Sequence, residues 1–445
     1  MKMIRAAVAL VFVITFNSCL LAQASAAGSH PKVVVISLDA FGAATLQDPY
    51  IATPMLHTLM KNGAYAKAMR PINPSVTWPN HTAIITGQDA SRHHLLVNGL
   101  IVDQRTDKKP HVEMWVPKAR LVAVPTLYDI AHKAGLTTAE IDWVAITRPG
   151  TIDWAFTERP DPDASIEREL IADGKTTRAD LLGFTSHPGA WRDRIYTNAA
   201  IDILRKHNPD LLLVHLLSMD AIQHETGFDT QADYNTEAFL DDRVAEIVDA
   251  VRANGDLDRT TFIVVSDHGQ QSLHNALHPN ALLKQENLQS ASTSTPTFAI
   301  EDGGCALVFQ KNATPTSIAA LKKLFEKKPG IYAALTEEEA SAQGWPKPGS
   351  TDQAPDLLLY AADDYAFSPD PGDAFVTKLD RQRGSHGYPN TFPLMQAIFI
   401  ASGAGIRNAG EIPAISNLDV APTVAHILHL QLRDAQGNAL TDILK

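Results

Sequence analysis

The chain has 445 residues, of which 45% are hydrophobic and 20% are charged, enough for one large α/β domain with insertions or for two domains. Its net charge of −12 at pH 7 argues against a nucleic-acid duplex as partner. A bound phosphate would need local cations, for which metal ions are the simplest source. Its two cysteines, Cys19 and Cys305, are too few to hold the fold together by disulfides.

Residues 1–26 have the pattern of a secretory signal peptide. Lys2 and Arg5 precede an apolar run at residues 6–16, and small residues at 24–26 fit a cleavage site. The apolar run is too short to span a bilayer, so we expect no transmembrane segment. Removal of the signal leaves 419 residues and changes the net charge from −12 to −14.

The signal peptide predicts an exported protein, either periplasmic or secreted. A lipid anchor on Cys19 is the less favoured alternative, because residues 16–18 before it match a lipoprotein signal poorly.

Three apolar runs, each typical of a buried parallel strand, end in segments that contain acidic or histidine side chains. They are residues 32–38 before Asp39, residues 210–217 before Asp220 and His224, and residues 260–266 before Asp267 and His268. Helical patterns at residues 191–207 and 232–253 alternate with these runs. The alternation predicts an α/β fold with a doubly wound, mostly parallel sheet.

Two other regions depart from this alternation. Residues 158–185 are polar, and we expect them to form a mobile insertion. From residue 275 the pattern changes, so we predict a smaller α+β insertion at 275–380 that covers the site. The catalytic core then comprises residues 27–274 and 381–445.

Thr77 lies in a segment, residues 74–87, that leads into an apolar helix. We expect Thr77 in a turn and Pro79 in the first helical turn, where its missing N–H is harmless. A hydroxyl beside free backbone N–H groups and the positive end of a helix dipole suits an activated alkoxide. Taken alone, the same pattern fits a simple helix cap.

The strand-end residues form a constellation with metal-binding chemistry. The carboxyl ends of parallel strands meet at one sheet edge, where ligands bind. Asp220 and His224 are four residues apart and so share a face of a helical turn, and His386 lies in a glycine-flanked loop. Together with the three groups after the first and third strands, they make six ligands, which suit two zinc ions with three protein ligands each. Such a pair could activate Thr77 for an in-line phosphoryl displacement.

The order and spacing of these motifs resemble the nucleotide pyrophosphatase/phosphodiesterase branch of the alkaline phosphatase superfamily. The matching segments lie between about residues 32 and 430, at 38–42, 77–81, 86–87, 98, 220–224, 266–269 and 384–388. This chain departs from the family at Ala40, where glycine is more frequent, and at Trp78, where phenylalanine is common.

The resemblance implies an alkaline phosphatase-like fold and a role for each matched residue. One zinc ion would take Asp220, His224 and His386, and the other Asp39, Asp267 and His268. Thr77 would be the nucleophile, with its Oγ bridging toward both ions. The side-chain amide of Asn98 and the backbone N–H of Trp78 would hold a phosphoryl oxygen.

Several of these residues have simpler interpretations. Asn98 precedes a glycine, a strong turn signal, and Trp78 and Trp143 could be core aromatics rather than walls of a substrate pocket. We interpret His215, which faces a core strand, as structural.

These observations predict an exported di-zinc phosphodiesterase or nucleotide pyrophosphatase that works through a phospho-threonine intermediate on a small phosphorylated substrate. The alternatives are a phosphomonoesterase, a phosphonate hydrolase and a catalytically silent zinc-binding envelope protein. Monoesterases of this kind carry a Lys-x-Arg pair, whereas the matching loop, which ends at Arg148, lacks the lysine. Lys118 and Arg120 form such a pair earlier in the chain. A sulfatase is disfavoured, because the chain has no Cys/Ser-x-Pro-x-Arg modification motif.

Overall fold

The computed structural model describes residues 30–48, 50–290, 292–370 and 372–445. The predicted signal peptide and Cys19 lie outside these residues. Within them, no helix is both long enough and apolar enough to cross a membrane.

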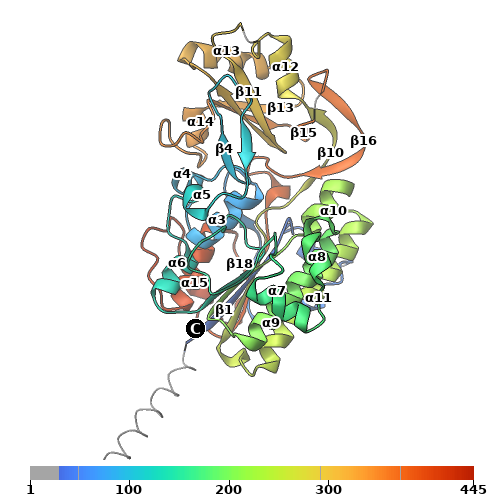
Figure 1. Ribbon diagram of the computed structural model, residues 1–445, viewed down its shortest axis with the longest axis vertical. Helices are drawn as coiled ribbons and strands as arrows, with labels where there is room; N and C mark the ends of the chain where they lie inside the picture. The colour runs from blue at the N-terminus through green and yellow to red at the C-terminus, as the bar shows by residue number, and fades with distance from the viewer. Residues whose placement is uncertain (1–29, 49, 291, 371) are drawn as a thin grey trace, which may run out of the picture.

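A central eight-stranded sheet organises the described chain (Figure 1). Its strand order is β18 (Gly410–Ile412), β2 (Ala64–Ala66), β17 (Phe399–Gly403), β9 (Thr260–Val265), β1 (Lys32–Leu38), β8 (Leu211–Leu216), β6 (Thr138–Ile141) and β7 (Trp154–Phe156). Neighbouring strands from β9 to β7 are all parallel, and β17 is antiparallel to both β9 and β2. The sheet is therefore mostly parallel, as predicted, with the predicted strand at residues 32–38 present in full.

Helices cover both faces of this sheet, which makes the fold doubly wound (Figure 1). Val34 and Ile36 of β1 pack on one side and Val33 and Val35 on the other, because successive strand residues point to opposite faces. One face is covered by α2 (Pro54–Asn62), α7 (Ser165–Ala172), α8 (Arg178–Leu182), α9 (Gly189–Lys206) and α11 (Gln231–Ala253). The other is covered by α3 (Thr77–Thr86), α6 (Leu127–Lys133) and α15 (Val420–Ile427).

The segment 158–185 differs from its prediction as a mobile insertion. It contains α7 and α8, and Ile166, Leu170 and Leu181 are buried in the main core. A capping box between Thr177 and Asp180 begins α8 and satisfies backbone N–H groups that would otherwise lack partners. Ile166 and Leu170 are four residues apart, as on one face of a helix, but the helix is short and the polar residues around it dominate the pattern.

A second, antiparallel sheet stands beside the carboxyl edge of the central one (Figure 1). It consists of β11 (Thr297–Asp302), β12 (Cys305–Gln310), β14 (Leu357–Ala361) and β13 (Ile331–Thr336), with α12 (Pro279–Gln285), α13 (Pro315–Phe325) and α14 (Glu337–Ser341). Its core is a separate apolar cluster that includes Leu277, Val308 and Phe325. The predicted insertion boundaries, 275 and 380, fall inside strands, so the division at these residues stays a prediction.

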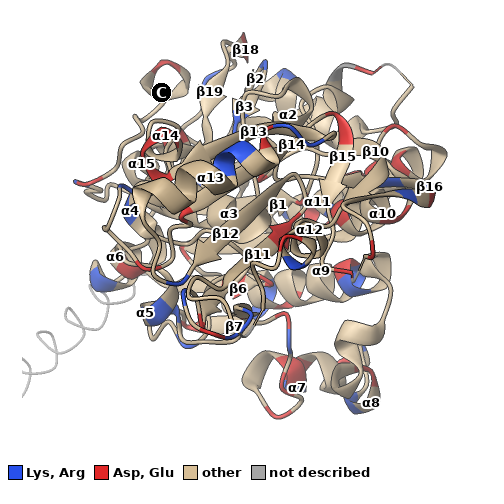
Figure 2. Ribbon diagram, turned by 90° about the horizontal axis from the view of Figure 1, so that it is seen from above, with Lys and Arg blue, Asp and Glu red and all other residues tan. Residues whose placement is uncertain are grey.

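Short elements join the two sheets. A three-stranded sheet contains β15 (Asp364–Phe367), β10 (Gln271–Leu277) and β16 (Val376–Ser385). The remaining named strands and helices are β3 (Met69–Arg70), β19 (Ile415–Ser416), β4 (Leu100–Val102), β5 (His111–Glu113), α4 (Ala90–His93), α5 (Lys118–Leu121) and α10 (Ser218–Thr226). Acidic and basic residues are distributed over many elements (Figure 2).

Candidate metal centre

The carboxyl edge of the central sheet brings the predicted strand-end residues together. Asp39 follows β1, and Asp267 and His268 follow β9, the neighbouring parallel strand. The backbone after β1 turns through Ala40, whose φ of 60° is in the left-handed region. Ala40 N–H then donates to Asp267 Oδ1 at 3.2 Å. Glycine would adopt this conformation freely, whereas a left-handed alanine costs ~1 kcal/mol.

Asp39, Asp267 and His268 form one cluster in which a ligand atom from each lies within 4.8 Å of the others. His268 Nε2 is 3.1 Å from Asp267 Oδ2 and 3.7 Å from Asp39 Oδ1. All three side chains are buried. Burial, followed by the charges of Asp267 and Asp220, raises the pKa of Asp39 well above its ordinary value. Burial lowers the pKa of His268 to about 4.

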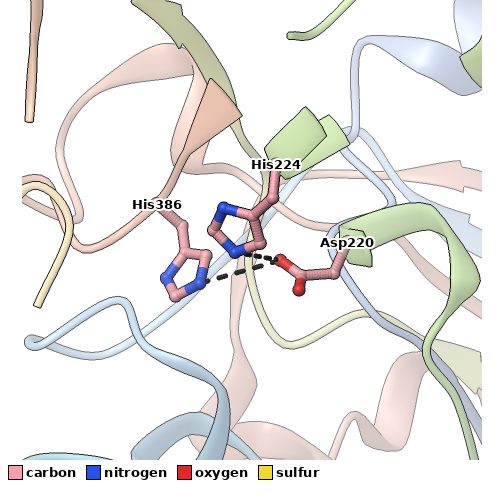
Figure 3. Close-up of side chains that lie close together, drawn as sticks. All are labelled: Asp220, His224 and His386. Atoms are coloured by element: carbon pink, nitrogen blue, oxygen red, sulfur yellow. Dashed lines mark ion pairs between the residues drawn. The ribbon is translucent and has the colours of Figure 1, made fainter. Parts of the chain in front are cut away.

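Asp220, His224 and His386 form a second cluster of the same size (Figure 3). Asp220 and His224 lie one turn apart on α10, with Asp220 Oδ1 3.2 Å from His224 Nε2. His386 follows β16, and its Nε2 is 3.7 Å from the same oxygen. Although burial alone would lower it, the Asp220 carboxylate raises the pKa of His224 to about 9. Burial lowers the pKa of His386 to about 3.

Hydrogen bonds hold this second cluster in place. The carboxylate of Asp193 accepts from the N–H groups of Leu217 and Ser218, both at 2.9 Å, and so anchors the start of α10. The Nδ1 atom of His224 lies 3.0 Å from the Gly384 carbonyl. The Nδ1 atom of His386 lies 3.2 Å from the Ser75 carbonyl, just before the Thr77 helix. Each imidazole thus keeps its Nε2 atom for the cluster.

The two clusters adjoin each other and Thr77. The rings of His268 and His386, one from each cluster, are stacked with centroids 3.9 Å apart. Thr77 is the first residue of α3 rather than part of a preceding turn, and its Oγ lies 3.2 Å from His268 Nε2. The Asn98 Oδ1 atom accepts from Trp78 N–H at 2.9 Å, so the amide is oriented beside the nucleophile position. This bond also occupies the N–H that was expected to hold a phosphoryl oxygen.

The residues of both clusters fit divalent cations. Each offers carboxylate oxygens and imidazole nitrogens, the donor types that zinc accepts. Asp39 Oδ1 and Asp267 Oδ2 are buried without a hydrogen-bond partner in the described part of the chain. A buried carboxylate oxygen without a partner is costly, and a bound cation would remove that cost.

The aromatic residues near Thr77 are arranged differently from the prediction for a substrate wall. Trp78 is only 4% exposed and packs in an apolar cluster, and Trp143 is 3% exposed with its ring against His81. Trp115, which sequence reasoning missed, is 38% exposed and meets Trp78 edge to face at 6.1 Å. No sequence signal marked Trp115, because its partner lies 37 positions away.

A cavity of about 560 Å³ has Trp115 in its wall. Its polar lining includes Glu140, Arg148 and Arg159, and the Arg159 guanidinium lies 5.3 Å from the centre of the Trp115 ring. Burial raises the pKa of Glu140 to about 8. Arg148 therefore lines this side cavity and belongs to neither of the two ligand clusters.

Two further residues were missed because their role depends on contacts across the fold. With its amide oriented to suit both partners, Gln270 donates to Asp220 Oδ1 at 3.0 Å and accepts from His224 N–H at 3.1 Å. His215, interpreted from sequence as structural, has its Nε2 atom 3.0 Å from Asp39 Oδ2. Both follow or lie in predicted strands, but nothing in one sequence shows which neighbour they reach.

Comparisons with known proteins show which family and fold this chain resembles. The family described as type I phosphodiesterase / nucleotide pyrophosphatase matches residues 33–389. An uncharacterised pyrophosphatase/phosphodiesterase of Schizosaccharomyces pombe is 25% identical over 427 residues, covering 91% of this chain and 78% of the relative. A bis(5′-adenosyl)-triphosphatase of Bos taurus is 22% identical over 425 residues, covering 93% and 81%.

Other relatives are much longer than the matched region. The ectonucleotide pyrophosphatase/phosphodiesterase family member 3 of Bos taurus is 20% identical over 443 residues, and the match spans 93% of this chain but 44% of that protein. Among solved structures, murine ectonucleotide pyrophosphatase/phosphodiesterase 5 superposes with a TM-score of 0.71 at 17% identity, covering 93% of this chain and 100% of the other. An inactive threonine-to-alanine form of that murine protein in complex with AMP gives 0.72 at 17% identity, with the same coverage.

Proposed function

The chain belongs to the type I phosphodiesterase / nucleotide pyrophosphatase family, and from that premise we propose that it is an exported di-zinc hydrolase of phosphodiester or pyrophosphate bonds. The observation that carries the proposal is the position of Thr77. Thr77 is the first residue of α3, and its Oγ lies 3.2 Å from His268 Nε2. The hydroxyl therefore lies beside two clusters of three candidate ligands each. The proposal of export rests on the signal-peptide pattern of residues 1–26 alone.

The proposed ligands divide as the clusters do, with Asp39, Asp267 and His268 around one ion and Asp220, His224 and His386 around the other. Bound zinc would supply Lewis-acid stabilisation of the phosphoryl oxygens and favour the ionised form of the nucleophile. A catalytically silent binding protein is less favoured, because the hydroxyl of Thr77 and all six ligands are present together.

The reaction proposed for Thr77 has two displacements. In the first, Thr77 Oγ loses its proton to solvent and bonds to phosphorus, while the bond from phosphorus to the leaving oxygen breaks and that oxygen takes up a proton. In the second, the oxygen of water bonds to phosphorus, the bond to Thr77 Oγ breaks, and a proton from the water returns to Thr77, which releases the phosphoryl product. The Asn98 amide, oriented by its bond to Trp78 N–H, would donate to a phosphoryl oxygen during both steps.

Nucleotides are the proposed substrate class. The similarity to a bis(5′-adenosyl)-triphosphatase and to a murine protein solved in complex with AMP supports this choice. A diester or pyrophosphate carries a second arm, and the exposed ring of Trp115 beside a 560 Å³ cavity offers that arm a surface. The arginines Arg148 and Arg159 would suit an arm with further negative charge.

The cation pair considered for a phosphomonoesterase is placed unfavourably for that role. Lys118 forms an ion pair with Asp129, and Lys118 N–H donates to the Thr147 carbonyl at 2.8 Å. Arg120 lines a different small cavity, beside His94. A monoester dianion needs a donor fork for its additional charged oxygen. We therefore favour a diester or pyrophosphate substrate over a monoester.

A substrate panel on purified, zinc-loaded protein tests the proposal. The panel contains a p-nitrophenyl monoester, a nucleotide diester and a phosphonate, with the Thr77→Ala variant as the blank. Turnover of the diester above the other two, lost in Thr77→Ala, is the expected result. Faster monoester or phosphonate turnover would move the protein to that alternative, and no turnover of any substrate would favour a silent binding protein.

A further inference from the structure

Three buried groups lie in a row behind the first metal-ligand cluster. Asp39 follows β1, His215 lies in β8, and Asp142 follows β6, and these three strands are neighbours in the central sheet. His215 Nε2 is 3.0 Å from Asp39 Oδ2, and its Nδ1 is 3.1 Å from Asp142 Oδ2. The three side chains are at most 5% exposed. One buried imidazole thus lies between two carboxylates, hydrogen-bonded to Asp39 Oδ2 and at ion-pair distance from Asp142 Oδ2.

The contact with His215 makes the two oxygens of Asp39 unequal. Oδ2 faces the His215 ring, whereas Oδ1 has no hydrogen-bond partner in the described chain and lies 3.7 Å from His268 Nε2. The ring therefore selects the oxygen that faces the cluster and fixes its direction. Removing a residue that hydrogen-bonds to a metal ligand typically weakens metal binding ~10- to 100-fold.

The backbone at Asp142 is held in an unfavourable conformation. Its φ of 54° is in the left-handed region, which costs a residue with a side chain ~1 kcal/mol. The bond from Asp142 N–H to the Phe156 carbonyl, at 2.8 Å, holds it there. The hydrogen-bond acceptor for His215 Nδ1 is the Asp142 carbonyl, at 3.1 Å, whereas the Asp142 carboxylate approaches the same nitrogen at ion-pair distance without a hydrogen bond. Strain retained at a buried polar contact is typical of functional sites.

We propose that His215 and Asp142 are positioning residues for the Asp39–Asp267–His268 cluster. His215 holds Asp39 Oδ2 so that Oδ1 faces the cation, and Asp142 fixes the His215 ring. The inference rests on the metal centre of the proposed function but not on hydrolysis. Zinc binding can be measured without a substrate, so a failure of this inference is distinguishable from a failure of the proposed activity.

The test measures zinc binding in a background that retains only the first cluster. His224→Ala removes a ligand from the second cluster, and calorimetry with zinc on the metal-stripped protein then follows the first. We expect His215→Phe in this background to raise the Kd for zinc ~10- to 100-fold. His215→Gln should recover part of the affinity, because its amide can still donate to Asp39. Asp142→Asn should give a smaller increase, because it keeps an acceptor for the ring.

His93→Gln is the matched control, since His93 is also fully buried but lies in α4 and bonds to Leu95 N–H. It should leave the Kd unchanged. An unchanged Kd in both His215→Phe and His215→Gln would overturn the proposal, as would an equal increase in the His93→Gln control. If His215→Phe does not fold, the Kd values for zinc of His215→Gln and Asp142→Asn are compared with that of His93→Gln. Values equal to that of the control would then overturn the proposal.

Discussion

The two ligand clusters have similar chemistry but are built on different parts of the fold. The Asp39 cluster stands on the ends of two paired strands, and its side chains are at most 4% exposed. The second cluster joins helix α10 to the loop after β16, and the side chain of His224 is 41% exposed. A site on paired strands is positioned more rigidly than one shared between a helix and a loop. We therefore expect the first cluster to hold zinc more tightly and the second to exchange it more readily.

The largest effect is expected from the group between the clusters. Thr77→Ala should reduce turnover at least ~10³-fold and leave both zinc ions bound, because the nucleophile is lost but no ligand is. Thr77→Ser should keep part of the activity. Turnover with a nucleotide diester and zinc content by elemental analysis provide the two measurements.

Thr82→Ala is a suitable control for this experiment, since Thr82 is a buried threonine on the same helix. It should retain both zinc and turnover. Efficient turnover by Thr77→Ala, with no phosphate on Thr77 in acid-quenched wild type, would indicate direct attack by water instead.

Removing one ligand from each cluster compares them directly. Asp267→Ala and His224→Ala should each lower activity at least ~10²-fold and release about one zinc, because three protein ligands per ion leave none to spare. The zinc that remains in His224→Ala should dissociate more slowly than the one that remains in Asp267→Ala. Two zinc ions and full activity in Asp267→Ala would contradict the ligand assignment.

The residues of the clusters were predictable from sequence because their signal is local. Apolar runs end at Asp39 and Asp267, and the four-residue spacing of Asp220 and His224 needs only one helical turn. His386 had the weakest signal of the six, since a glycine-flanked histidine alone says little, and the family resemblance strengthened it. The structure brings all five of these together with His268, although the metal roles themselves stay proposals.

What could not be predicted depends on contacts between distant segments. His215 has the pattern of a core strand residue, and its contact with Asp39 exists only because β8 pairs with β1. Trp115 lies in a polar, irregular stretch and meets Trp78 only through the path of that loop. Periodicity identifies elements but contains no information about which side chains meet across them.

The clusters can also be compared with the aromatic surface formed by Trp78 and Trp115. The clusters would hold the phosphoryl group, and the aromatic surface would hold the second arm of the substrate. We expect kcat/KM to be at least ~10-fold higher for a nucleotide or aryl diester than for the matching monoester, since stacking on an aromatic ring is worth ~1–3 kcal/mol. Trp78→Ala should narrow the gap, mainly through weaker diester binding, because the buried Trp78 ring supports Trp115 edge to face. Trp115→Ala should do so too, because Trp115 is the more exposed ring.

Zinc content should stay at the wild-type value in both tryptophan variants, which separates loss of the arm's surface from damage to the clusters. Equal or faster turnover of the monoester by the zinc-loaded wild type would contradict the diester assignment. Lys118 and Arg120 would then be the first residues to substitute.

The smallest expected effect concerns protons, which distinguish the clusters when metal is absent. In the metal-free protein the Asp220 carboxylate, acting against burial, raises the pKa of His224 to about 9, whereas burial lowers that of His268 to about 4. A folded-state pKa above the unfolded value of ~6.5 means that the pair of His224 and Asp220 stabilises the protein fully below that pH. This stabilisation is lost as the pH rises through 9.

The Tm of metal-stripped wild type should therefore fall more between pH 6.5 and 9 than that of metal-stripped His224→Gln. Because the His224 side chain is 41% exposed, water weakens the pair, and we expect a difference of only about 1–3 °C. The raised pKa of Asp39 lowers stability in the same direction, but it does so in both proteins and cancels in the comparison. Scanning calorimetry of both proteins between pH 6.5 and 9 measures this difference in Tm. An identical pH dependence of Tm would show that the second cluster holds no proton of its own.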